Sequence, residues 1–348
     1  MGIIIDYPGL LTTIQDEGRF GYGQFGVTPS GPMDAESFQV ANLLVGNDPG
    51  ESALEATILG PTFHVTEDTI LAITGADMSP TMTGVRIPMN RAIVVPAGSE
   101  VKLQAAQNGS RTYIAFQGGF DVPMVMGSRA TSIQNHIGGF GGRKLEKGDV
   151  LALRPVSGPP QNLPHRAVSH QIRRKRENVV RVLLGPQEDC FTEAGLAAFL
   201  KTPYTVSRDF DRMGCRLEGQ PIQHKTDGNI ISDGIANGAV QVPTTGQPII
   251  MLAERQSTGG YTKIATVISV DLPVVGQCCP GDVIRFQAVS LEEAHRLLKE
   301  RRSRMEDLHR YLNEPPAVHT FRVSMKGKVY EAVVETINGE GSFLHVHN

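Results

Sequence analysis

Short apolar runs, separated by glycine turns, succeed one another along most of this chain. Residues 69–74, 92–96 and 179–184 are examples, each rich in β-branched side chains. Residues 101–105 alternate apolar and polar side chains, as a half-buried strand does. With 38 glycines and 22 prolines available for turns, the sequence predicts a mainly β protein whose strands are short.

Two similar segments stand far apart in the chain. Residues 148–157 and 281–290 both begin with Gly-Asp-Val, continue with alternating apolar residues and end with Val-Ser. The similarity of the two segments favours two related β-domains in tandem. Two independent strands, each entered by a Gly-Asp turn, explain it equally well.

The sequence divides into two β regions and a C-terminal extension. Its 348 residues exceed the 100–200 or so that are typical of one domain. We therefore expect a first β-domain over residues 1–157, a linker over residues 158–178 and a second β-domain over residues 179–289. A helix over residues 290–313 and a hairpin tail over residues 319–348 follow. The linker carries a Gly-Pro-Pro break and a basic run, which we interpret as a solvated connector.

Helical periodicity predicts two short helices, over residues 33–45 and 192–200, and the long one over residues 290–313. In the long helix apolar residues recur at every seventh position, and Ser290 with Glu293 forms a capping box. The apolar stripe packs either on the protein itself or on a second copy. A homo-oligomer formed through the 290–313 helix is therefore one hypothesis.

Charge and missing motifs exclude several classes of protein. A net charge of −3 gives no field for nucleic acid or an anionic membrane. No run approaches the ~20 apolar residues of a membrane helix, and the first residues do not resemble a signal peptide, so we expect a cytoplasmic protein. The sequence contains no P-loop, G-x-S-x-G or H-E-x-x-H motif. The four cysteines and ten histidines show no metal-ligand spacing, so no metal-binding residue is expected.

Two polar, glycine-rich clusters lie in the first half of the chain. One holds Asp16 and Arg19, with Asn42 further on, and the other is a glycine run that contains Gly141 and ends at Arg143. Successive backbone N–H groups can bind an anion, with an arginine as the counter-charge. The alternative is structural, with Asp16 paired to Arg19 and the glycine run forming an ordinary loop.

Two further clusters lie in the second half. The third, residues 207–217, includes Asp211 and Arg212 among three arginines and two aspartates, which suits either anion binding or internal salt bridges. The fourth begins near Gln241 and continues after a buried strand over residues 249–253. The polar residues that follow this strand are Glu254, Arg255, Ser257, Thr258, Gly259, Gly260 and Tyr261. Without a nucleophile–base pair, this mixture suits polarising a carbonyl or stabilising an oxyanion.

These clusters, in this order, resemble a known family over about residues 1–290. The stretches that carry the resemblance include Asp16-x-Gly18-Arg19-x-Gly21-Tyr22, Ser30-Gly31-Pro32-Met33-Asp34, Leu54-Glu55-Ala56-Thr57, Asp211-Arg212-Met213-Gly214 and Arg255-Gln256-x-Thr258-Gly259-Gly260-Tyr261. The family is named variously KipA, allophanate hydrolase subunit 2, biotin-dependent carboxyltransferase-like protein and the C subunit of 5-oxoprolinase. Where family members commonly have Asp and Thr, this chain has Glu254 and Ser257, a difference that bears on substrate preference.

The resemblance implies a fold and partners. Family members look like two tandem cyclophilin-like β-barrel domains, which agrees with the repeated Gly-Asp segments. They work with a KipI-like B subunit and, in the oxoprolinase, with an A subunit as well. The tail from residue 321 to 335 resembles the lead-in of a biotinyl carrier domain, although the biotinylation motif is absent.

The function that the resemblance favours is that of the C subunit of an ATP-dependent 5-oxoprolinase, active only in its complex. This enzyme opens the lactam ring of 5-oxoproline, a small amide substrate, to give glutamate. ATP with Mg²⁺ would activate the lactam oxygen, which calls for arginines, carboxylates and oxyanion donors. The residues assigned to these roles are Arg212, Arg255, Asp211, Glu254, Glu55 and the loop 138–142.

Two alternatives stay open. One is carboxyl transfer to an amide or urea nitrogen from carboxybiotin on a separate carrier, with the biotin ureido oxygen held by Gln241, Tyr261, Ser257, Thr258 and Arg255. The other is a non-catalytic antagonist of a KipI-like kinase inhibitor, docked through the long helix.

Overall fold

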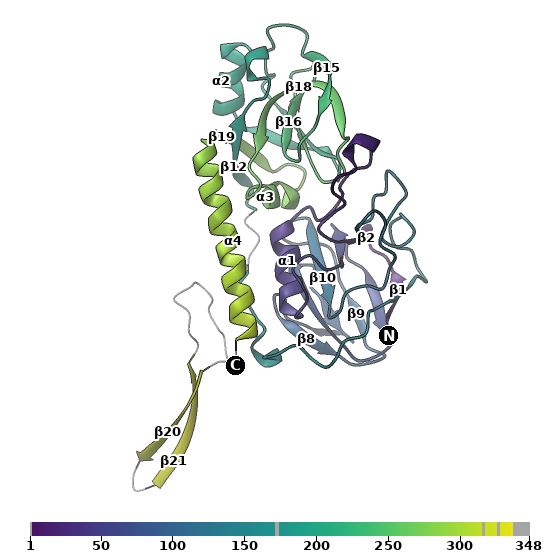
Figure 1. Ribbon diagram of the computed structural model, residues 1–348, viewed down its shortest axis with the longest axis vertical. Coiled ribbons are helices and arrows are strands. Elements are labelled where there is room, and N and C mark those ends of the chain that lie inside the picture. The colour runs from purple at the N-terminus through teal and green to yellow at the C-terminus, as the bar shows by residue number, and fades with distance from the viewer. Residues whose placement is uncertain (1, 171–173, 315–316, 326–327, 337–348) are drawn as a thin grey trace.

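Two β units lie one above the other, and a long helix runs along the side of both (Figure 1). The computed structural model describes residues 2–170, 174–314, 317–325 and 328–336. All strands of the first unit fall between residues 2 and 152, and those of the second between residues 177 and 288. The mainly β fold with few helices and a C-terminal helix is as the sequence predicts.

The first unit is a sandwich of two sheets. One sheet has the order β11-β1-β4-β9-β6-β7 and the other β2-β3-β10-β5-β8. Their strands are β1 Gly2–Tyr7, β2 Leu11–Gln15, β3 Ala53–Thr57, β4 Thr62–Val65, β5 Thr69–Gly75, β6 Thr81–Met82, β7 Val85–Arg86, β8 Ala92–Val95, β9 Glu100–Lys102, β10 Arg111–Phe116 and β11 Val150–Ala152. Alternate residues such as Ile3 and Ile5 on β1 share one core with Ile73 on β5, since successive side chains of a strand point to opposite faces.

Helix α1, Ala35–Leu44, covers the outer face of the second of these sheets. It begins where Asp34 accepts hydrogen bonds from the N–H groups of Glu36 and Ser37, a standard N-cap. Phe38 packs edge-on against Tyr113 of β10, with ring centroids 5.9 Å apart. The helix expected over residues 33–45 is thereby confirmed.

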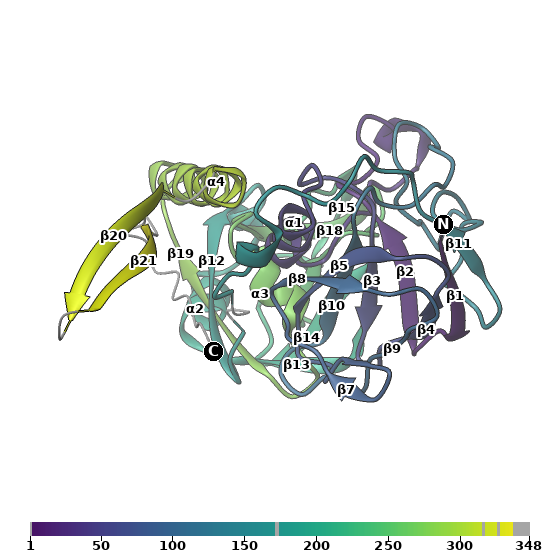
Figure 2. The same cartoon turned by 90° about the horizontal axis from the view of Figure 1, so that it is seen from below.

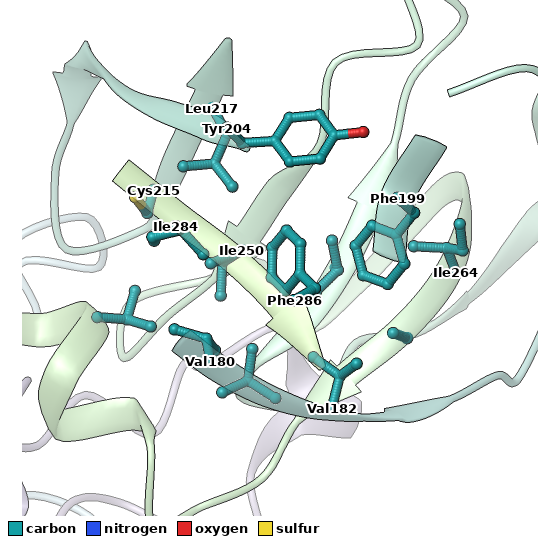
Figure 3. Close-up of a cluster of buried hydrophobic side chains, with 14 of the residues drawn as sticks. Val180, Val182, Phe199, Tyr204, Cys215, Leu217, Ile250, Ile264, Ile284 and Phe286 are labelled. Atoms are coloured by element: carbon teal, nitrogen blue, oxygen red, sulfur yellow. The ribbon is translucent and has the colours of Figure 1, made fainter. Parts of the chain in front are cut away.

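The second unit is a closed sheet of short strands. Its order is β12-β19-β13-β14-β17-β16-β18-β15, and a further antiparallel pairing of β12 with β18 closes it. Its strands are β12 Glu177–Leu184, β13 Tyr204–Phe210, β14 Gly214–Gly219, β15 Asn229–Gly234, β16 Ala239–Val242, β17 Ile249–Met251, β18 Thr258–Val267 and β19 Val283–Ala288. Figure 3 shows Val180 and Val182 pointing inward with Phe286, which stacks on Phe199 at 4.4 Å.

Two short helices and three 3-10 turns complete the two units. They are α2 Glu193–Lys201, α3 Leu272–Gln277, η1 Gly23–Phe25, η2 Leu163–His165 and η3 Glu188–Cys190. Helix α2 follows the predicted 192–200 and is capped by Thr192. The sequence did not predict α3, because Pro273 and Gly276 interrupt its pattern.

Helix α4, Leu291–Asn313, is the long predicted helix, and the Ser290 hydroxyl accepts from the N–H of Glu293 as its capping box requires. Near its start Ala294 packs on the second unit, and near its end Leu308 and Leu312 pack beside α1. Figure 2, viewed along α4, shows the helix against both units. Because Ala294, Leu308 and Leu312 of the stripe are buried on their own chain, the stripe does not support the hypothesis of a homo-oligomer through this helix.

Beyond α4 the strands β20 Ala317–Met325 and β21 Lys328–Thr336 pair in an antiparallel hairpin that extends away from the two units. The predicted turn at 326–327 and the end of the tail, 337–348, lie outside the described residues. Among the described helices none combines the length and the apolar character needed to span a membrane.

Arg166 joins the C-terminal ends of α1 and α4. Its side chain is only 1% exposed. It donates to the carbonyls of Leu43 at 2.5 Å and Leu44 at 2.6 Å, and to that of Leu312 at 2.8 Å. Burial lowers the pKa of this guanidinium to about 10. A cation at two helix C-termini satisfies carbonyls that have no partner within their helices.

We expect the substitution Arg166→Met to lower the free energy of unfolding by about 2–3 kcal/mol, because it leaves buried carbonyls without donors. Amide hydrogen exchange near Leu312 should also accelerate, since α4 loses this attachment. Arg310→Met, on the exposed side of the same helix, is the matched control and should change little. Equal urea midpoints for the two variants would contradict this role.

Candidate functional site

A groove with a volume of about 730 Å³ opens on the second unit. It is lined by residues of β13, β14, β16, β17 and β18 together with the turns between them, so it unites the third and fourth predicted clusters. Polar groups on its wall include Arg208, Asp211, Arg216, Gln241, Gln256 and Tyr261. Apolar side chains such as Phe210 and Ile249 separate them, a mixture typical of small-molecule sites.

Gln241 lies in the wall of this groove and is held by strands on both sides. It is 5% exposed, and β16 places it opposite Ile249 of β17 and Lys263 of β18. Its amide nitrogen Nε2 is buried and has no hydrogen-bond partner in the described structure. A buried donor without an acceptor costs free energy, so such a group in a groove wall is a candidate for ligand binding.

Gly259 leaves room for that amide. A Cβ atom at position 259 would lie 2.8 Å from Nε2 of Gln241 and 2.8 Å from Cδ1 of Ile235. Tyr261, two residues further along β18 and 41% exposed, stands at the rim of the groove. Gly259 of the fourth cluster therefore leaves the space that the amide of Gln241 occupies in the groove wall.

Arg212 lies behind the groove, between the two units. Its Nε donates to Glu254 at 2.8 Å, its Nη2 donates to the carbonyl of Gly31 at 2.7 Å, and its Nη1 donates to Glu55. The guanidinium is 4% exposed. Burial opposes its charge, but Glu55 and Glu254 outweigh burial and raise the pKa of Arg212 above its usual value.

Glu55 receives further support from the first unit. Its Oε2 accepts from the Tyr113 hydroxyl at 2.8 Å and from the N–H of Met33 at 2.9 Å. Burial, followed by the Glu55 charge, raises the pKa of Tyr113 well above its usual value. The three residues Glu55, Arg212 and Glu254, which we call the interface triad, are thus saturated with protein partners and do not line the groove.

Asp211 and Arg255 have mainly structural contacts. Asp211 lines the groove and accepts from the N–H groups of Met213 at 2.7 Å and Gly214 at 3.0 Å, which fixes the turn between β13 and β14. Arg255 donates to the carbonyl of Ile235 at 2.9 Å. Burial lowers the pKa of Arg255, and no carboxylate of the described chain forms an ion pair with it.

The first-half candidates do not join this groove. Arg19 is 1% exposed and donates to backbone carbonyls, while Asp16 accepts from Ser128. Both residues therefore have the structural role given as the alternative to anion binding, through contacts with the loop 125–130 and not through a direct pair. The amide of Asn42 donates to the carbonyl of Glu51.

The predicted anion-binding cluster that contains Gly141 and ends at Arg143 also lies outside the groove and has structural contacts. Arg143 forms a two-pronged ion pair with Asp149, at 2.7 and 2.8 Å, which lowers the pKa of that carboxyl. Gly141 is exposed next to it, and a Cβ at Gly138 would clash with the carbonyl of Ala130. Neither glycine is among the residues that line the groove.

Of the fourth cluster, Gly259, Gly260 and Tyr261 line the groove, whereas Ser257 and Thr258 lie just before them, at the start of β18. Sequence reasoning did not select Arg208, Arg216 and Gln256 as site residues, although all three line the groove. The signal was present in β14, where Arg216 is exposed between the buried Cys215 and Leu217.

The family described as "Carboxyltransferase domain, subdomain A and B" matches residues 25–288, a span that includes the whole groove. The chain belongs to this family. Its carboxyltransferase fold therefore accounts for both β units, and residues 207–261 form the groove within it.

The relatives of this chain include C subunits of bacterial 5-oxoprolinases and urea amidolyases of yeasts. The C subunit of the Escherichia coli 5-oxoprolinase is 38% identical over 86% of this chain and 95% of its own length. The urea amidolyase of Saccharomyces cerevisiae is 36% identical over 86% of this chain but only 17% of its own length. The crystal structure of the Kluyveromyces lactis urea amidolyase superposes with a TM-score of 0.83 at 31% identity, covering 88% of this chain and 20% of that one.

Proposed function

We propose that this protein is the C subunit of an ATP-dependent 5-oxoprolinase, which opens the lactam of 5-oxoproline to glutamate together with a KipI-like B subunit and an A subunit. Similarity to the C subunits of two bacterial 5-oxoprolinases over nearly the full length of both chains supports the proposal. Within this protein, the observation that carries the proposal is that Gln241 lines the groove and that its buried Nε2 has no hydrogen-bond partner in the described structure.

The groove suits the carbonyl of a neutral amide. Nε2 of Gln241 is buried and has no hydrogen-bond partner in the described structure. A lactam oxygen that accepts a hydrogen bond from this atom would supply the missing partner. The hydrogen bond polarises the lactam C=O group and so favours addition of water to the carbonyl carbon, after which the C–N bond breaks and the ring nitrogen takes up a proton. Fixed pairing of β16 with both neighbours holds the donor in place.

Two of the carboxylates assigned to Mg²⁺, Glu55 and Glu254, are occupied by Arg212. Among the described residues no group of three or more His, Cys, Asp or Glu side chains is placed to hold a metal ion. Because Mg²⁺ in phosphoryl-transfer sites often takes only one or two protein carboxylates besides phosphate oxygens, we propose that ATP and its metal bind away from the interface triad, at a site that the other subunits of the complex complete.

Carboxyl transfer is the second candidate, because a ureido oxygen is also a planar acceptor for Gln241. Carboxybiotin on a separate carrier would supply the carboxyl group when bound. In this chain, Gln241 and Tyr261 line the groove and fit a ureido group, while Arg255 is directed to backbone carbonyls.

The deciding experiment is ATP-dependent release of glutamate from 5-oxoproline by this protein with its A and B subunits, each omitted in turn. We expect release only with all three present. If the associated subunits release no glutamate, the proposal fails. Biotin-dependent, avidin-sensitive consumption of ATP with urea would then establish carboxyl transfer instead.

We also propose that both units are cyclophilin-like β-domains, the first built as two facing sheets and the second as a closed barrel, with limits near residues 157 and 179. We propose further that the protein acts in the cytoplasm. Closure of the second sheet through β12 and β18 supports the barrel. Cys190, Cys215, Cys278 and Cys279 are free thiols, as is usual in a reducing compartment.

A further inference from the structure

Two loops of the first unit expose large apolar side chains. Phe20 and Phe25 are each 70% exposed, Met124 is 59% exposed and Met126 is 43% exposed. We call these four side chains the apolar knob. Exposed apolar side chains on neighbouring loops commonly mark interaction surfaces.

Buried polar contacts tie the two loops together. Arg19, next to Phe20, donates through Nε to the carbonyl of Val125 at 2.9 Å, between Met124 and Met126. It also donates through Nη2 to the carbonyl of Ala130 at 2.9 Å. The knob is therefore a fixed feature of the fold rather than two independent loops.

The tips of both loops stand away from the rest of the chain. A Cβ atom at Gly21, Gly23 or Gly26 would meet nothing within 4 Å, and η1 protrudes in dark purple at the junction of the two units (Figure 1). In the other loop Met126, with φ of 53°, is at the tip of a tight turn whose ends, Val125 and Ser128, exchange backbone hydrogen bonds. A left-handed conformation at a methionine costs about 1 kcal/mol, so the turn presents this side chain at a cost.

We propose that the apolar knob is the surface on which the KipI-like B subunit docks, by insertion into an apolar recess of that subunit; this inference rests on the proposed function. The relatives indicate that another protein chain, and not solvent, covers the apolar knob. In yeast urea amidolyase the same unit is 17% of one long chain, whereas in the E. coli enzyme it is nearly the whole chain. In the long urea amidolyase chain, other parts of the same chain can contact this unit. In the short 5-oxoprolinase chain, such contacts must come from another subunit.

The knob is also connected to the site. The carbonyl of Pro29 accepts from the N–H of Arg19 at 2.6 Å, and the carbonyl of Gly31 accepts from Arg212, which lies behind the groove. A subunit docked on the knob would thus contact the segment that ends at the interface triad. This places the partner next to the part of the chain that positions the groove.

The test measures the dissociation constant of the purified B subunit for the full chain by calorimetry, without substrate. The double substitution Phe20→Ser/Phe25→Ser should weaken binding at least about a hundredfold, since aromatic anchors dominate interface energies. Met124→Ser/Met126→Ser, on the other loop, should weaken it at least about tenfold. Val85→Ser is the matched control, because Val85 on β7 is also 70% exposed, and should leave binding unchanged.

Unchanged binding in both double variants overturns the inference, as does the absence of any binding by the wild-type chain. A third outcome would also overturn it. If light scattering showed that the wild-type chain is a dimer and the Phe20→Ser/Phe25→Ser variant a monomer, while the B subunit still bound this variant, the knob would join two copies of the chain. The calorimetric test measures no turnover, so it is independent of the glutamate-release assay. If the B subunit bound through the knob but the reconstituted complex released no glutamate, the proposed function would fail and the docking surface would stand.

Discussion

Replacing Arg212 by methionine is expected to lower the free energy of unfolding by about 3–5 kcal/mol, the usual effect of removing one member of a buried ion pair. Arg212 is 4% exposed and balances Glu55 and Glu254, which are 1% and 4% exposed. Without the guanidinium both buried carboxylates lose their ion-pair partner, and the carbonyl of Gly31 loses its donor. Urea denaturation followed by circular dichroism measures the change.

Two further variants separate charge from packing. Arg216→Met, on the exposed wall of the groove, should change stability by less than about 0.5 kcal/mol. The triple variant Glu55→Gln/Arg212→Met/Glu254→Gln should recover part of the loss, because neither carboxylate is then left charged and without Arg212. If Arg212→Met were as stable as wild type, the interface triad would not hold the two units together.

The elements that the sequence predicts best are those whose burial follows a simple period. In β12 the residues Val180 and Val182 are buried while Val179 is 57% exposed, as alternation requires. In α4 the spacing of apolar residues and the Ser290 cap define the helix almost to the residue. Local pattern does not reveal which partner such a stripe packs on, and here α4 packs on both units of its own chain.

The site was predicted less completely, because charged side chains look alike in a sequence whether they face a ligand or each other. Asp211 and Arg212 are neighbours, yet one lines the groove and the other is enclosed by Glu55, 157 positions away. Partners so distant in sequence leave no local signal. The sequence placed Gln241, Gly259 and Tyr261 in one cluster, and all three line the groove because β16 and β18 pair directly.

The substitution Gln241→Met is expected to separate stability from activity. It removes a buried donor that has no acceptor and replaces it with an apolar side chain of similar size, so the free energy of unfolding should rise by about 1 kcal/mol. Turnover of 5-oxoproline by the reconstituted complex should fall by about 10²–10³-fold, as when one donor to an oxyanion is lost. Urea denaturation and the glutamate-release assay measure the two effects.

The matched control is Gln15→Met, because Gln15 is equally buried but has partners: its side chain donates to the carbonyl of Thr131 and accepts from the N–H of Gly31. That variant should lose stability and keep its turnover number at temperatures where it is folded. Gly259→Ala should resemble Gln241→Met in activity, since its Cβ would lie 2.8 Å from Nε2 and displace the amide. A destabilised Gln241→Met with normal turnover would mean that Gln241 serves the fold, and the carbonyl of the substrate would then need another donor.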